Sequence, residues 1–150
     1  MAVDSPSLPL SGGCSCGAVR FEVSEQLLGA LYCHCKRCQR RTGTAFSVSA
    51  LTVPGSFRLL EGEELVASWD PGDGWIKSWC GRCGGHLYTT NPDNPQMLSV
   101  RMGALDDDPG IRPSAHQFVA YAAPWEPIPE DGLPRFDERI PASAYGQAGE

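Results

Sequence analysis

The hydrophobic pattern of this 150-residue chain changes every few residues, and most of it follows the alternation of β-strands. The clearest case is residues 18–23, where Val19, Phe21 and Val23 alternate with charged residues, as in a half-buried strand. Many short strands at close spacing predict a mainly β domain that is chiefly antiparallel. Similar apolar runs predict further strands at 28–33, 45–53, 57–60, 65–69, 75–80, 86–90, 97–102 and 117–121.

Glycine and proline separate these segments. The chain has 17 glycines and 13 prolines, which are too many for a helical bundle. Residues 36–43 (KRCQRRTG) are predicted to form a short helix that ends at Gly43, and the prolines after about residue 124 predict an extended arm lying on the domain. We therefore expect a flexible N-terminus at 1–10, one domain at 11–138 and a frayed tail at 139–150.

Composition and charge narrow the class of protein. Apolar residues make up 41% of the chain, and no apolar run approaches the roughly 18 residues of a membrane helix. The first ten residues lack the basic region and long apolar stretch of a signal peptide, so we expect a cytoplasmic protein. In that compartment cysteine clusters are metal or redox sites more often than disulfides. The net charge of -6 disfavours nucleic acid and acidic membranes as partners.

Seven cysteines carry the strongest chemical signal, and an odd number does not fit a framework of disulfides alone. CGRCG at 80–84 is a knuckle whose glycines let backbone amides point at the thiolates, and GGCSCG at 12–17 lies on the turn into strand 18–23. Together they predict a closed, structural four-thiolate zinc site, with buried free thiols or a disulfide as alternatives. Its ligands would be Cys14, Cys16, Cys80 and Cys83.

Cys33, Cys35 and Cys38 remain as a set of three. Three protein ligands and one open position are the signature of catalytic zinc. His34 is a candidate fourth ligand, but in a segment leaving a strand its side chain points away from its neighbours, and a core or surface role is simpler. An iron–sulfur cluster is a further alternative, which the missing fourth cysteine weakens.

A basic run follows these cysteines in an otherwise acidic protein. Such cations would lower thiol pKa values and attract an anionic ligand, because arginine pairs with carboxylates through two hydrogen bonds. A solvated helix face is the alternative. The candidate substrate-binding residues are Lys36, Arg37, Arg40 and Arg41.

The remaining candidates are single side chains. His116 is a candidate general acid, although a lone histidine before an apolar strand is more often structural. Four aromatic residues could line a ligand groove or, more simply, belong to the core. They are Trp75, Trp79, Tyr121 and Trp125.

Five segments also resemble the successive motifs of a known protein family: GGCSCGAVRFEV, CHCKRCQRRTGTAF, WCGRCGGHLY, GALDDDPGIRPSAHQFV and APWEPIPEDGLPRFDE. From about residue 11 to 138 the chain resembles the glutathione-dependent formaldehyde-activating enzyme family, which includes the centromere protein V type. The resemblance implies a β-tent fold with zinc-ribbon-like knuckles and two zinc ions, divided four and three among the cysteines. It also implies condensation of glutathione with formaldehyde to S-hydroxymethylglutathione, formally a carbon–sulfur lyase reaction.

At an open zinc a glutathione thiol would bind as thiolate, which makes Cys33, Cys35 and Cys38 the candidate catalytic residues. Formaldehyde bound beside it would need proximity and a proton for its oxyanion. Two other functions stay open at this point. One is a zinc-dependent glutathione-binding carrier without turnover. The other is a zinc-ribbon interaction module, which the acidic balance disfavours.

Overall fold

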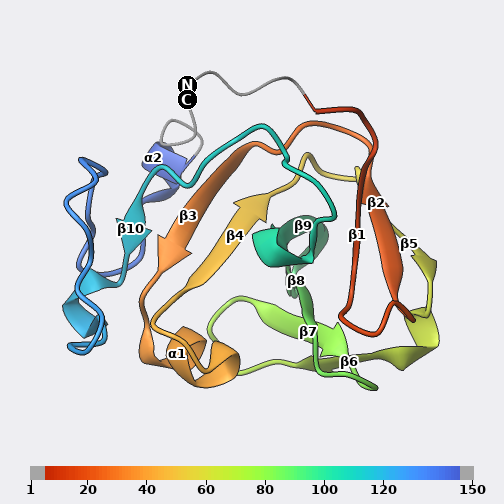
Figure 1. Ribbon diagram of the computed structural model, residues 1–150, viewed down its shortest axis with the longest axis horizontal. Helices are drawn as coiled ribbons and strands as arrows, with labels where there is room; N and C mark the ends of the chain where they lie inside the picture. The colour runs from red at the N-terminus through yellow and green to blue at the C-terminus, as the bar shows by residue number, and fades with distance from the viewer. Residues whose placement is uncertain (1–5, 146–150) are drawn as a thin grey trace. The chain divides into compact units, whose positions relative to one another are not determined.

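The computed structural model describes residues 6–145 (Figure 1). The chain divides into two compact units. The first unit comprises Met1–Leu28 and Ala50–Ile111, and the second comprises Gly29–Ser49 and Arg112–Glu150. Each unit therefore brings together segments that are far apart in the sequence. Residues 1–5 and 146–150, which belong to the expected flexible ends, lie outside the described residues, and the expected domain boundaries stay predictions.

The first unit contains a three-stranded antiparallel sheet in the order β1, β2, β5. Its strands are β1 (Leu10–Gly13), β2 (Arg20–Val23) and β5 (Phe57–Glu61). The alternation in β2 follows burial as predicted, since Phe21 and Val23 are fully buried while Glu22 forms an ion pair with Arg58 of β5 at 2.7 Å. Strand β1 was not predicted because its sequence, LSGG, has only one apolar residue.

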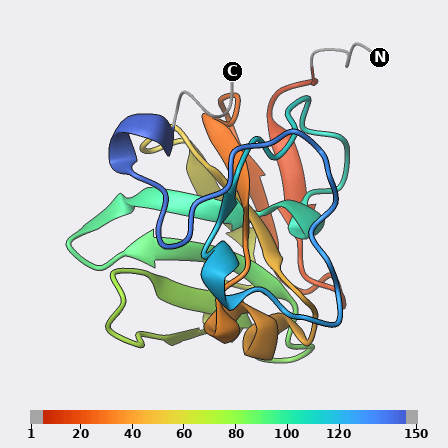
Figure 2. The same ribbon diagram turned by 90° about the vertical axis from the view of Figure 1, so that its left-hand side faces the viewer.

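Two hairpins form the rest of this unit, and Figure 2 shows them one above the other. Their strands run antiparallel in the order β6, β7, β8, β9. The inward side chains Leu87 and Val100 are fully buried. The strands are β6 (Val66–Trp69), β7 (Ile76–Cys80), β8 (His86–Asn91) and β9 (Asn94–Arg101), and the 3-10 turns η1 (Glu63–Leu65) and η2 (Met102–Ala104) flank them.

The second unit is built around β3 (Gly29–Cys33), which pairs in parallel with the two-residue strand β10 (His116–Gln117). Helix α1 (Lys36–Thr42) follows β3 and ends at Gly43, as predicted, because Gly43 adopts the left-handed φ of 69° that closes a helix. Strand β4 (Ser47–Leu51) comes next and runs into the first unit. The buried core of this unit contains Leu31, Cys33, Ala115 and Ile140.

The predicted strand 117–121 is wrong. Regular pairing stops after Gln117 because Phe118 has a φ of 58°, and residues 119–121 turn into the 3-10 segment η3 (Val119–Tyr121). The Phe118 ring packs against the core cluster, and its N–H donates to the carbonyl oxygen of Glu138 at 3.0 Å. Tertiary contacts with the proline-rich arm thus replace a strand partner, and the short helix α2 (Ala142–Tyr145) follows that arm.

The mainly β class of the predicted β-tent is confirmed by these short strands and cysteine-bearing turns. The sheets are chiefly antiparallel, with β3 and β10 as a parallel pair. Within residues 6–145 no helix has the length and apolar character needed to cross a membrane.

Candidate metal centres

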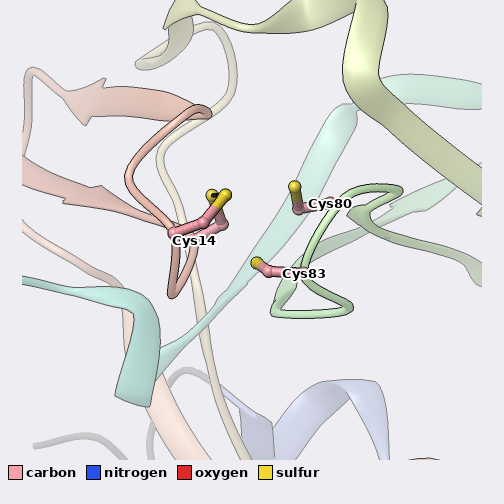
Figure 3. Close-up of side chains that lie close together, drawn as sticks. Cys14, Cys80 and Cys83 are labelled. Atoms are coloured by element: carbon pink, nitrogen blue, oxygen red, sulfur yellow. Dashed lines mark hydrogen bonds between the residues drawn. The ribbon is translucent and has the colours of Figure 1, made fainter.

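The first cysteine group lies within the first unit, between the β1–β2 turn and the β7–β8 loop. Figure 3 shows the sulfur atoms of Cys14, Cys80 and Cys83 directed toward a common space. With Cys16 they form a group of four sulfurs, all within 4.8 Å of one another, and the Cys14 and Cys16 sulfurs are 3.6 Å apart. Tetrahedral zinc with Zn–S bonds of about 2.3 Å places its sulfurs about 3.8 Å apart. The group therefore fits a zinc ion.

Backbone amides prepare these sulfurs for negative charge. The N–H of Val19 donates to the Cys14 sulfur at 3.2 Å, and the N–H of Gly85 is the main cause that lowers the pKa of Cys83 to about 6. Gly85 also lets the two loops approach closely, since a Cβ there would lie 3.1 Å from the Ser15 nitrogen and 3.4 Å from the Cys83 sulfur. Gly85, which directly follows the CGRCG knuckle at 80–84, thus both donates a hydrogen bond to a thiol and leaves space for the second loop.

The second cysteine group lies within the second unit at the junction of β3 and α1. Cys33 ends β3, Cys35 is the N-cap of α1, and Cys38 lies in its first turn. The three sulfurs lie within 4.8 Å of one another, and no other cysteine, histidine or carboxylate of the described chain joins them. The N–H of Cys38 donates to the Cys35 sulfur at 3.3 Å, and the Ser47 hydroxyl donates to the Cys38 sulfur at 3.2 Å.

The surroundings of this second group are mostly apolar. Cys33 is a member of the buried core, while Cys35 and Cys38 pack against it. The adjacent Cys35 and Cys38 sulfurs, followed by burial, raise the pKa of Cys33. Three crowded thiols of this kind cannot share negative charge by themselves, whereas a divalent cation compensates it and favours the thiolates. The donor set therefore fits a metal ion with three protein ligands.

The four predicted basic residues all lie on α1, next to the second group. Lys36 and Arg40 are exposed, while Arg37 and Arg41 are partly buried. Arg40 and Arg41 occupy the last turn, where a cation interacts favourably with the helix dipole. The helix thus supplies a structural reason for these two residues besides any contact with a ligand.

His34 and His116 are both buried, with 4% and 2% of their surface exposed. His34 is not a member of the three-cysteine group, as strand alternation predicted; its ring instead forms a hydrogen bond with His116 at 2.8 Å. Burial, followed by His116 and Arg135, lowers the pKa of His34 to about 4, so His34 is uncharged at neutral pH. His116 also contacts Asp131, and no local pattern in the sequence points to this partner.

The four candidate groove aromatics do not gather within one unit. Trp75 and Trp79 belong to the first unit and are partly buried. Tyr121 and Trp125 belong to the second unit and are 49% and 65% exposed. Neither pair has the deep burial of core residues.

The model of the family described as glutathione-dependent formaldehyde-activating enzyme matches residues 9–121. The chain belongs to this family. All seven cysteines lie inside the matched stretch. The family assignment and the two cysteine groups therefore rest on the same segment of the chain.

Two curated relatives carry that same family name, in each case as a provisional assignment. A protein of Halomonas elongata is 27% identical over 108 residues, covering 66% of this chain and 67% of the relative. A protein of Sordaria macrospora is 28% identical over 90 residues, covering 55% of this chain and 38% of the relative. A crystal structure of a Rhodobacter sphaeroides protein shares the fold, with a TM-score of 0.55 and 23% identity over 83% of this chain and 98% of that one.

Proposed function

We propose that this chain is a zinc-dependent enzyme that joins glutathione to formaldehyde and forms S-hydroxymethylglutathione, formally as a carbon–sulfur lyase. The observation that carries the proposal is the contrast between a complete group of four sulfurs and a group of three. Membership of the family supports glutathione and formaldehyde as the reactants. Because reducing conditions keep the seven cysteines as thiols, we place the activity in the cytoplasm.

The four-cysteine group would hold a structural zinc ion. Cys14 and Cys16 come from the N-terminal turn, while Cys80 and Cys83 come from a loop distant in the sequence. A metal ion that joins two such loops stabilises the fold directly, since the unfolded chain cannot present the four thiolates together.

The three-cysteine group would hold the second zinc ion and leave one position for the glutathione sulfur. Zinc bound there lowers the pKa of an incoming thiol, so that the thiol is a thiolate near neutral pH. Within the protein, the hydrogen bonds from Ser47 to Cys38 and from the Cys38 N–H to Cys35 stabilise the ligand sulfurs as thiolates.

The condensation needs no oxidant and no bond to the protein. The glutathione sulfur forms a bond to the formaldehyde carbon, the carbonyl π bond breaks, and the oxygen takes up a proton to balance the one that sulfur lost. The protein contributes mainly by holding both reactants together. We assign attraction of the glutathione carboxylates to the basic residues of α1, with exposed Lys36 and Arg40 the most accessible of them.

The test is an exchange NMR measurement with 13C-labelled formaldehyde and glutathione. A thiol and an aldehyde also combine without a catalyst, so the exchange rate with the protein is compared with the rate in a blank. The zinc-loaded protein should accelerate exchange between free formaldehyde and the hydroxymethyl thioether carbon, and removal of zinc should abolish the acceleration. If the protein binds glutathione in calorimetry but leaves the exchange rate at the blank value, it is a carrier and the proposed activity is wrong.

A further inference from the structure

Three polar side chains of the second unit form a hydrogen-bonded series that begins at the surface. It ends at His34, the residue between Cys33 and Cys35. The Asp131 carboxylate lies 2.8 Å from Nε2 of His116, and Nδ1 of His116 lies 2.8 Å from Nε2 of His34. Both rings are buried, whereas the Asp131 side chain is 26% exposed. Because His34 lies between Cys33 and Cys35, this hydrogen-bonded series ends within the segment that carries two of the proposed metal ligands.

His34 is held through its backbone as well as its ring. Its N–H donates to the carbonyl oxygen of Gln117 at 3.0 Å, and its carbonyl oxygen accepts from Nε2 of Gln39 at 2.9 Å. The Gln39 amide also donates to the carbonyl oxygen of Tyr121 at 2.9 Å. The residue that links two cysteine ligands therefore has its N–H, its carbonyl and its ring fixed at once.

His116 is fixed in turn by its own neighbours. Its ring stacks on Tyr32, with centroids 4.7 Å apart and planes 12° from parallel. Its N–H donates to the carbonyl oxygen of Pro134, and its carbonyl oxygen accepts from the N–H of Phe136 at 2.8 Å. A buried network whose members are all partnered is rigid, which is the property that a metal-ligand segment needs.

We propose that His116 and Asp131 are positioning residues that act through His34 to hold the Cys33–Cys35 segment. They keep the three sulfurs converging on one metal ion and the fourth position open to an incoming thiol. The inference rests on the proposed function of the three-cysteine group. Partners that orient metal ligands typically contribute about 10- to 100-fold in metal affinity, which sets the expected size of the effect.

Hydrogen-bond chemistry fixes the direction of the outer bond. A carboxylate only accepts, so Asp131 accepts from Nε2 of His116. In the inner bond, one of the two nitrogens, Nδ1 of His116 or Nε2 of His34, donates and the other accepts. The His116 ring therefore carries a proton on Nε2, and that proton can be observed by 15N NMR.

The experiment measures zinc affinity at the second site by chelator competition, together with the absorption spectrum of cobalt bound there. His116→Phe keeps an aromatic ring on Tyr32 but removes both hydrogen bonds, and it should weaken zinc by about 10- to 100-fold and shift the cobalt bands. His116→Asn retains an amide near the Nδ1 position and should recover part of the loss. Asp131→Asn should weaken zinc less than His116→Phe does, and the exposed control Asp137→Asn should not change it.

The possible outcomes separate this inference from the proposed function. Unchanged zinc affinity and cobalt bands in His116→Phe would overturn the positioning role while leaving the proposed activity intact. If the unaltered protein holds no metal at the second site, both are overturned. Should His116→Phe fail to fold, the 15N spectrum of the unaltered protein decides the question. A His116 ring held with its proton on Nε2, facing Asp131, supports the role, and a His116 ring that averages between tautomers contradicts it.

Discussion

The two cysteine groups differ in how the chain assembles them. The group in the first unit joins two glycine-rich loops that are far apart in sequence, and two of its members, Cys16 and Cys83, are exposed. The group in the second unit comes from six consecutive residues at the junction of β3 and α1, and Cys33 is buried among apolar side chains. In the first arrangement the proposed zinc would join loops that are distant in sequence, whereas the second arrangement is assembled by local structure.

The difference extends to what surrounds the sulfurs. Backbone amides contact the first group, which suits a closed site whose only task is to bind metal. A serine hydroxyl, a helix N-cap and a buried histidine chain contact or flank the second. Side-chain support of this kind around an incomplete ligand set indicates a site built for a ligand from outside.

Cys80→Ser should have the largest effect, because it removes one ligand of the closed four-cysteine group. Structural zinc binding contributes about 10–16 kcal/mol in small zinc domains, which is as large as the whole stability of a typical domain. We expect insoluble or molten protein, as judged by solubility, zinc content and circular dichroism. Arg82→Ser, an exposed substitution in the same loop, should fold normally. A folded Cys80→Ser variant with full zinc content would show that the assignment is wrong.

Cys35→Ser should affect the second cysteine group and leave the first one intact. Because the second site is not needed to join distant loops, the variant should fold and keep one zinc per chain while losing the second zinc and all condensation activity. Zinc analysis and the exchange NMR assay measure the two properties on one sample. Thr44→Ser, an exposed change just beyond α1, is the control and should keep both zinc ions. Retention of two zinc ions by Cys35→Ser would contradict the three-ligand site.

Ser47→Ala should test the side-chain support of the second group, because it removes the hydroxyl hydrogen bond to Cys38. A hydrogen bond of this kind contributes about 1 kcal/mol, so second-site zinc affinity should fall by about fivefold with the first site unchanged. Chelator competition measures both sites. Ser24→Ala, which alters a serine of the first unit, should leave the second site as it is. The same loss in both variants would mean that the effect is not local.

Arg37→Ala and Arg40→Ala should give the smallest effects. Arg40 is exposed and Arg37 is partly buried, and a charge pair at the protein surface contributes about 0.2–1 kcal/mol. Glutathione should therefore bind up to about fivefold more weakly, and the difference should shrink at high salt. Calorimetry at two salt concentrations measures this, with zinc content as the check that the site is intact. Arg58→Ala, which changes an exposed arginine of β5, is the control. Unchanged affinity in both α1 variants would return these arginines to the role of a solvated helix face.

The sequence predicted local features well and tertiary partners poorly. Alternation located β2 and the hairpin strands, and Gly43 marked the end of α1, because these signals are contained in a few neighbouring residues. Cysteine spacing identified Cys33, Cys35 and Cys38 as one local set for the same reason, whereas the pairing of two distant cysteine loops rested on the four ligands that a closed zinc site needs. The strand predicted over 117–121 failed because Phe118 takes a left-handed backbone conformation and packs into the core through contacts with a segment about twenty residues later.

The histidine chain shows the same limit at the candidate site. His34 and His116 were each interpreted alone, and both were expected to be structural more often than functional. Their contact joins residues 82 positions apart, and Asp131 lies a further 15 positions along the chain. No periodicity or motif links such residues, so only the folded structure reveals that they form one network.

The central claim is that Cys33, Cys35 and Cys38 leave one coordination position for a thiol from outside. Its most direct test is the absorption spectrum of cobalt at the second site, isolated as the difference between the unaltered protein and Cys35→Ser. Adding glutathione should change the spectrum from three to four thiolate ligands without changing the bands of the first site. A spectrum that shows four protein thiolates before glutathione is added, or that does not respond to glutathione, would contradict the claim.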